Sequence, residues 1–316
     1  MRRKWKRIGV GAAIAAAAVT AAYLLLDMED RELDDRARAE APGQFVTLSE
    51  GKVHYELSGP SKGPAVVLVH GFSVPAYVWD PTFEALEAAG YRVLRYDLYG
   101  RGFSDRPDVD YDLDLFVNQL AELTDALKVE TPFHLAGLSM GGPVTAAFAS
   151  RFPQKVRSLA LFDPFTKPLT LGELFPLNVP GVGELFTSIA VVPFMLPKRQ
   201  LNDFYRPERF PGWIDKYKAQ MRFKGFRRAI LSTLRLFLHR VEPLPLYKRV
   251  NALDLPVLLI RGAADRMVTA EQATLLRAAL PLAEYHEIPE AAHAPHLERP
   301  DVVNPLLLDF IAAHTP

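Results

Sequence analysis

The chain has 316 residues, 49% of them hydrophobic, and its 37 basic residues balance 37 acidic ones. This composition excludes a disordered or fibrous protein and is sufficient for one large α/β core. The lack of cysteine excludes disulfides and thiolate metal sites, and the lack of a basic stripe in the folded part argues against a nucleic-acid partner.

The first 26 residues predict a membrane anchor. Residues 8–26 carry no charge, and a helix of nineteen residues spans about 28 Å, close to the thickness of a bilayer core. Basic residues precede this run and acidic residues follow it, so the positive-inside rule places the folded domain on the non-cytoplasmic side, which is the periplasm in a bacterium. A cleaved signal peptide, giving a secreted protein, and a soluble alanine-rich helix are the alternatives. Residues 27–43 read as a charged linker.

The remaining chain predicts an α/β fold. Residues 44–49 and 52–58 suggest an opening hairpin. Continuous apolar runs typical of buried parallel strands follow at 65–69, 91–96, 133–136, 156–162 and 256–260. Helical candidates between them include 80–89, 113–128 and 143–151. This alternation predicts a mostly parallel sheet with helices on both faces.

One long segment interrupts the alternation. Residues 165–248 contain many prolines and aromatic residues but no strand pattern. We expect this segment to form a helical cap inserted into a core made of residues 44–164 and 249–316.

A nucleophile motif follows the strand predicted at 133–136. Gly137-Leu138-Ser139-Met140-Gly141 has the G-x-S-x-G pattern between a strand and a helix, where a sharp turn exposes the serine hydroxyl above the sheet. Such a turn needs small neighbours on both sides of the serine. The following helix N-terminus favours developing negative charge, so Ser139 is the candidate nucleophile.

His70-Gly71-Phe72 follows the strand predicted at 65–69, and here the chain resembles the α/β-hydrolase superfamily, whose oxyanion loop often begins with His-Gly. The resemblance implies that the backbone N–H groups of Phe72 and Met140 form the oxyanion hole. It also implies that His70 shapes the loop and is not the catalytic histidine.

Two further motifs supply the partners of the serine. Asp265 lies in a turn after the strand predicted at 256–260 and resembles the superfamily's triad acid, with Asp163 as its main rival. His293 lies in a segment that resembles the superfamily's histidine loop, although Ala292 stands where glycine is usual. His296 is the second candidate for the base. The order serine, aspartate, histidine is the one this fold uses.

The resemblance extends over residues 44–314 and includes a structural loop, Asp97-Leu98-Tyr99-Gly100-Arg101-Gly102-Phe103-Ser104, which removes Ser104 as a competing nucleophile. A serine nucleophile with an oxyanion hole suits acyl transfer without a cofactor or metal. We therefore predict a carboxylic ester hydrolase, an esterase or lipase, acting on hydrophobic small-molecule esters. Carbon–carbon bond hydrolysis, cofactor-free haloperoxidase or perhydrolase chemistry, and a ligand receptor that does not turn over are the alternatives.

Overall fold

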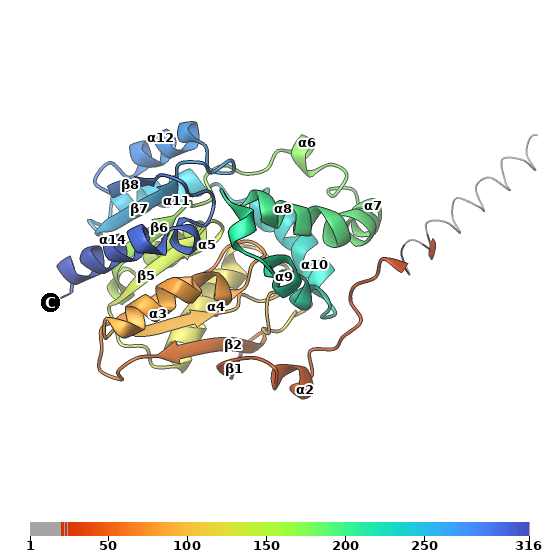
Figure 1. Ribbon diagram of the computed structural model, residues 1–316, viewed down its shortest axis with the longest axis horizontal. Coiled ribbons are helices and arrows are strands. Elements are labelled where there is room, and N and C mark those ends of the chain that lie inside the picture. Colours follow the sequence, from red (N-terminus) through yellow and green to blue (C-terminus); the bar gives the residue numbers. More distant parts are fainter. Residues whose placement is uncertain (1–19, 22, 24, 316) are drawn as a thin grey trace, which may run out of the picture.

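One eight-stranded sheet organises the computed structural model, which describes residues 20, 21, 23 and 25–315 (Figure 1). The strand order is β1-β2-β4-β3-β5-β6-β7-β8. The β1–β2 and β2–β4 pairs are antiparallel, and every other neighbouring pair is parallel. The strands are β1 (Gln44–Leu48), β2 (Gly51–Ser58), β3 (Ala65–Val69), β4 (Arg92–Tyr96), β5 (Phe133–Leu138), β6 (Val156–Phe162), β7 (Val257–Gly262) and β8 (Glu284–Ile288). The predicted fold class is confirmed.

Both faces of the sheet are covered, because its central strands β3 and β5 are buried at every position. In β3, Val67 and Val69 pack into the core on one face, while Val66 and Leu68 pack into a second core on the other. The first face carries α4 (Leu113–Ala126), α5 (Gly141–Arg151), α11 (Pro243–Asn251) and α12 (Ala270–Ala279), and the second carries α3 (Asp80–Ala88) and α14 (Pro300–Ala313). The short elements η1 (Ala76–Trp79), η2 (Pro153–Lys155) and α13 (Pro295–Glu298) lie in the connecting loops.

Between β6 and β7, the chain up to Leu238 forms a helical cap beyond one end of the sheet (Figure 1), whereas α11, which contains the expected boundary at residue 248, packs on the core. Its helices are α6 (Leu171–Leu174), α7 (Val182–Phe186), η3 (Thr187–Met195), α8 (Leu196–Asn202), η4 (Pro207–Arg209), α9 (Trp213–Met221), α10 (Phe226–Ser232) and η5 (Thr233–Leu238). The cap thereby faces the carboxyl ends of β3 and β5, the edge where parallel sheets build their sites.

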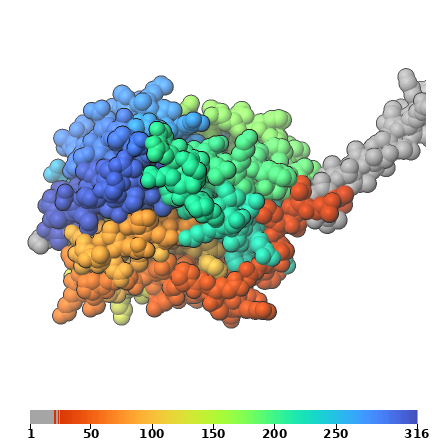
Figure 2. Space-filling model, in the orientation of Figure 1, coloured from red at the N-terminus to blue at the C-terminus, as the bar shows by residue number. Residues whose placement is uncertain are grey.

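Residues 27–40, here called the N-terminal strap, lie against the cap instead of standing clear of it (Figure 2). Asp30 pairs with Arg222 at 2.7 Å, and Glu29 pairs with Arg227 at 3.1 Å. The strap also contains α2 (Asp35–Arg38), whose Arg38 pairs with Asp105 of the core. Charges that the sequence assigns to a linker therefore form contacts with both cap and core.

The predicted membrane localisation is wrong for the part of the chain that the structure describes. No helix among those residues is both long and apolar enough to cross a bilayer. Most of the expected anchor (residues 8–19, 22 and 24) lies outside the described residues. The prediction of an anchored domain on the non-cytoplasmic side rested on hydropathy and flanking charge alone, and a uniformly apolar run does not fix a membrane-spanning helix.

Candidate active site

Ser139 occupies a strained turn between β5 and α5. Its φ is +51°, a left-handed conformation that costs a non-glycine residue about 1–2 kcal/mol. The turn requires glycine at positions 137 and 141. A Cβ at Gly137 would lie 2.6 Å from the Gly141 carbonyl oxygen, and a Cβ at Gly141 would lie 2.5 Å from the Val69 carbonyl oxygen. The Ser139 N–H donates to the Phe162 carbonyl at 2.9 Å and fixes the turn to β6. The G-x-S-x-G pattern thus has a steric origin.

His293 and Asp265 form a hydrogen-bonded pair. His293 Nδ1 lies 2.8 Å from Asp265 Oδ2, and the Met267 N–H donates to Asp265 Oδ1 at 2.6 Å. Burial opposes both charged forms, but the charge of each group and their hydrogen bond prevail: the pKa of Asp265 is lowered to about 2 and the pKa of His293 is raised above 6.5. Because the carboxylate holds the proton on Nδ1, Nε2 is left as the basic nitrogen.

Asp163, the rival acid, lies beside Asp265 but has another partner. Both of its carboxyl oxygens face the Gly262 N–H, at 3.1 and 3.2 Å. Complete burial and the negative charge of Asp265 raise the pKa of Asp163 well above its usual value. Of the two candidates, Asp265 is the one hydrogen-bonded to the imidazole.

The loop after β3 offers backbone donors to the site. Within the described chain, neither the Phe72 nor the Met140 N–H donates a hydrogen bond, so both are free to bind an oxyanion. Arg101, fully buried, donates to the Phe72 carbonyl at 2.7 Å. His70 accepts from the Leu98 N–H at 2.9 Å, and burial lowers its pKa to about 4. Arg101 and a neutral His70 therefore fix the shape of this loop.

The other candidate side chains are engaged in structural contacts. His296 is buried against Trp79 with ring centroids 4.2 Å apart, its Nε2 donates to the Val78 carbonyl at 3.1 Å, and burial lowers its pKa to about 3. Ser104 is buried and donates to the Asp97 carbonyl at 2.6 Å. Neither residue lines the cavities that surround Ser139.

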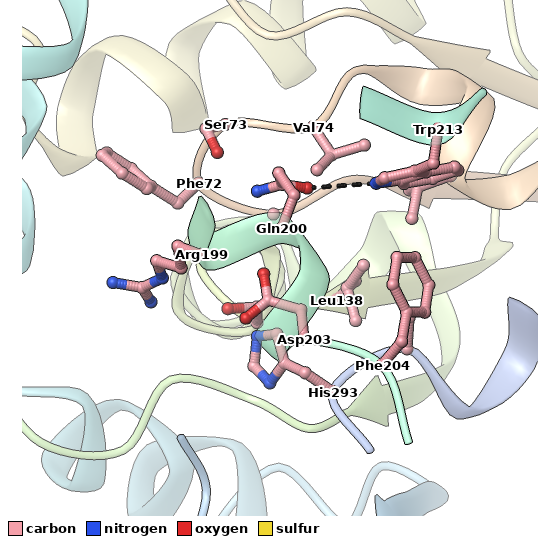
Figure 3. Close-up of a pocket in the computed structure, with 14 residues that line it drawn as sticks. Phe72, Ser73, Val74, Leu138, Arg199, Gln200, Asp203, Phe204, Trp213 and His293 are labelled. Carbon is pink, nitrogen blue, oxygen red and sulfur yellow. Dashed lines mark hydrogen bonds between the residues drawn. The ribbon is translucent and has the colours of Figure 1, made fainter. Parts of the chain in front are cut away.

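Two cavities meet at Ser139 and His293. The first, of about 50 Å³, runs under α8 and α9 and is walled mainly by apolar side chains (Figure 3). Those apolar side chains are Phe72, Val74, Val78, Leu138, Phe204 and Trp213. The second, of about 290 Å³, lies between the cap and the start of α12 and is more polar. No hydrogen bond joins Ser139 to the His293 ring among the described residues, and such bonds often tighten only when substrate binds.

A family model described as the alpha/beta hydrolase family matches residues 66–306. The chain belongs to the alpha/beta hydrolase family. It is 29% identical over 284 residues to 2-hydroxy-6-oxo-6-phenylhexa-2,4-dienoate hydrolase of Burkholderia cepacia, covering 85% of this chain and 96% of that protein. It is 27% identical over 274 residues to Lipase 3 of Moraxella sp. (strain TA144), covering 84% and 82%. The enol-lactonase from Burkholderia xenovorans LB400 has a similar fold, with a TM-score of 0.73 at 23% identity, covering 85% of this chain and all of that one.

The cap of this alpha/beta hydrolase contributes two charged residues that sequence reasoning missed. Arg199 and Asp203, both at α8, line the first cavity, and the Asp203 carboxylate lies beside the His293 ring (Figure 3). The His293 N–H donates to the Asp203 carbonyl at 3.0 Å. Burial raises the pKa of Asp203. No sequence motif identifies either residue. Within the described chain, no cluster of three potential ligands is arranged to hold a metal.

Proposed function

We propose that this alpha/beta hydrolase cleaves carboxylic esters through an acyl-enzyme, with Ser139 as nucleophile, His293 as general base and Asp265 as the acid that orients the histidine. The observation that carries the proposal is the meeting of four features around one hydroxyl. These are the strained elbow, the His293–Asp265 pair, two free backbone N–H groups and two cavities.

The chemistry follows from these positions. His293 Nε2 takes the proton of the Ser139 hydroxyl as its oxygen attacks the ester carbonyl, and the N–H groups of Phe72 and Met140 bind the resulting oxyanion. The imidazolium, stabilised by Asp265, protonates the leaving alcohol as the carbon–oxygen bond breaks. Water then loses a proton to His293 and attacks the acyl-enzyme, which releases the acid and restores the serine.

We assign different roles in this reaction to the core and to the cap. In the proposed division, the core of residues 44–164 and 249–316 supplies the triad and the oxyanion hole. The cap of residues 165–248 encloses the substrate with Phe204 and Trp213, two aromatic side chains that favour an apolar acyl or alcohol group.

The second candidate is hydrolysis of a carbon–carbon bond, which the same groups can support. The near full-length match to a dienoate hydrolase supports it as an alternative. A 2-hydroxy-6-oxo-dienoate substrate, followed by loss of its absorbance, separates this reaction from ester hydrolysis.

Active-site labelling with a fluorophosphonate tests the nucleophile. We expect the wild-type protein to be labelled and Ser139→Ala to be unlabelled, while Ser150→Ala, on the adjoining α5, serves as the matched control and is labelled like wild type. A p-nitrophenyl ester series from acetyl to octanoyl measures turnover in the same samples. Folded wild-type protein that is not labelled overturns the assignment of Ser139, and labelling without turnover of esters or dienoates favours a receptor.

A further inference from the structure

The second cavity beside Ser139 carries an excess of positive charge. Lys167, Arg199 and Arg266 all line it. Within the described part of the chain, none of these three cations lies within 4.0 Å of a carboxylate oxygen, although basic side chains elsewhere on the cap, such as Arg206 and Arg235, are paired. Arg199 instead directs one N–H to the Met267 sulfur at 3.3 Å, a weak acceptor.

The one carboxylate in the lining offsets only part of this charge. Glu173 accepts hydrogen bonds from the Thr170 N–H at 2.8 Å and the Thr170 hydroxyl at 2.7 Å, which lower its pKa and keep it ionised. Within the lining of the second cavity, three cations and one anion give a net charge of about +2 at neutral pH, while Asp203, which lines only the first cavity, interacts with the charge of Arg199. Thr269, the N-cap of the ten-residue helix α12, also lies in this wall, so the helix N-terminus adds partial positive charge.

The three cations belong to segments that adjoin the proposed triad. Phe165, two residues before Lys167, donates its N–H to the Ser139 carbonyl at 2.9 Å. Arg266 directly follows Asp265, whose carboxylate accepts the Met267 N–H at 2.6 Å. Arg199 lines both cavities, so its side chain borders the point where they meet. A group bound among these three residues would therefore lie next to the scissile bond.

We propose that the second cavity binds a carboxylate carried by the substrate, so that the preferred substrates are anionic esters. This inference rests on the proposed ester hydrolysis and names its substrate class. A volume of about 290 Å³ equals the share of about ten water molecules, enough for a short chain or ring that ends in a carboxylate. Arginine suits this role because its planar guanidinium binds a carboxylate through two parallel N–H donors.

Matched ester pairs test the proposal, with the anion on either side of the scissile bond. The first pair is 4-nitrophenyl hemiglutarate and its neutral methyl ester, and the second is 3-(butyryloxy)benzoate and its methyl ester. We expect kcat/KM to favour the anion at least tenfold in one pair at low salt, and Arg199→Gln to reduce that ratio to about threefold or less. Lys198→Gln, its exposed neighbour on α8 outside both cavities, serves as the control and leaves the ratio unchanged.

Binding of the same four compounds to Ser139→Ala, measured by calorimetry, separates this proposal from the proposed reaction. We expect the anionic member of one pair to bind at least tenfold more tightly than its neutral partner, and Arg199→Gln in the same background to remove the difference. Equal binding of anionic and neutral members in both pairs overturns the carboxylate site. A wild-type protein that hydrolyses none of the four refutes ester hydrolysis, while the calorimetry still decides whether the cavity binds anions.

Discussion

Replacement of Asp265 by asparagine is the sharpest test of the proposed triad. Asp265 Oδ2 lies 2.8 Å from His293 Nδ1, and only 1% of the aspartate side chain is exposed. At an effective dielectric constant of about 20, two unit charges at that distance attract each other by about 6 kcal/mol, an upper limit for what the imidazolium gains in the transition state. Asparagine removes this attraction and no longer holds the proton on Nδ1.

We expect Asp265→Asn to lower kcat/KM by about 10³–10⁴-fold, which corresponds to about 4–5.5 kcal/mol at about 1.4 kcal/mol per tenfold change. The assay is hydrolysis of p-nitrophenyl butyrate at pH 8, with protein concentration taken from absorbance and folding checked by circular dichroism. The loss is smaller than the upper limit because hydration compensates part of the lost attraction.

Asp163→Asn is the matched control in the same buried pair. Because Asp163 accepts from the Gly262 N–H and has no hydrogen bond to the His293 ring, we expect kcat/KM to fall less than tenfold in Asp163→Asn. A large loss in Asp163→Asn together with a loss below tenfold in Asp265→Asn would refute the reasoning and make Asp163 the acid.

Two other predictions concern pH and backbone strain. Burial lowers the pKa of His293, but the charges of Asp265 and Asp203 raise it above 6.5, so we expect kcat/KM to rise with pH through that pKa. Asp203→Asn moves the midpoint of the pH–rate profile to lower pH. An unchanged midpoint contradicts an interaction between Asp203 and His293. Gly102→Ala, at φ +51° with its new Cβ 1.9 Å from Asp97 Oδ2, costs more than about 2 kcal/mol in urea unfolding. Gly212→Ala, at φ +78° with no atom within 4 Å, costs about 1 kcal/mol, and the reverse ranking would contradict the packing around Asp97.

The sequence predicted the core and the candidate triad because both depend on local patterns. The strand runs are mainly apolar, and Ser139 and Asp265 each follow a strand end by one to three residues. Parallel strands bring their carboxyl ends to one edge, so such residues converge whatever separates them along the chain. The choice between Asp163 and Asp265 required geometry, since both residues meet this description.

Sequence reasoning failed where long-range contacts decide the outcome. Arg199 and Asp203 lie in a helix without a motif, and only the packing of the cap brings them to His293. The cations of the second cavity come from three separate segments, so their gathering leaves no trace in local composition. The apolar residues of the cap led to a prediction of hydrophobic substrates, and no local pattern indicated the cations that line the second cavity.

The N-terminal strap has a consequence for how ionic strength acts on the enzyme. The strap joins cap and core through ion pairs whose side chains are partly exposed, such as Asp30–Arg222. Exposed pairs of this kind contribute at most about 1 kcal/mol each and weaken as salt screens them. Because two backbone hydrogen bonds of 2.9 Å also join Arg31 to Arg222 and Lys224 of the cap, added salt weakens only the ionic part of this attachment.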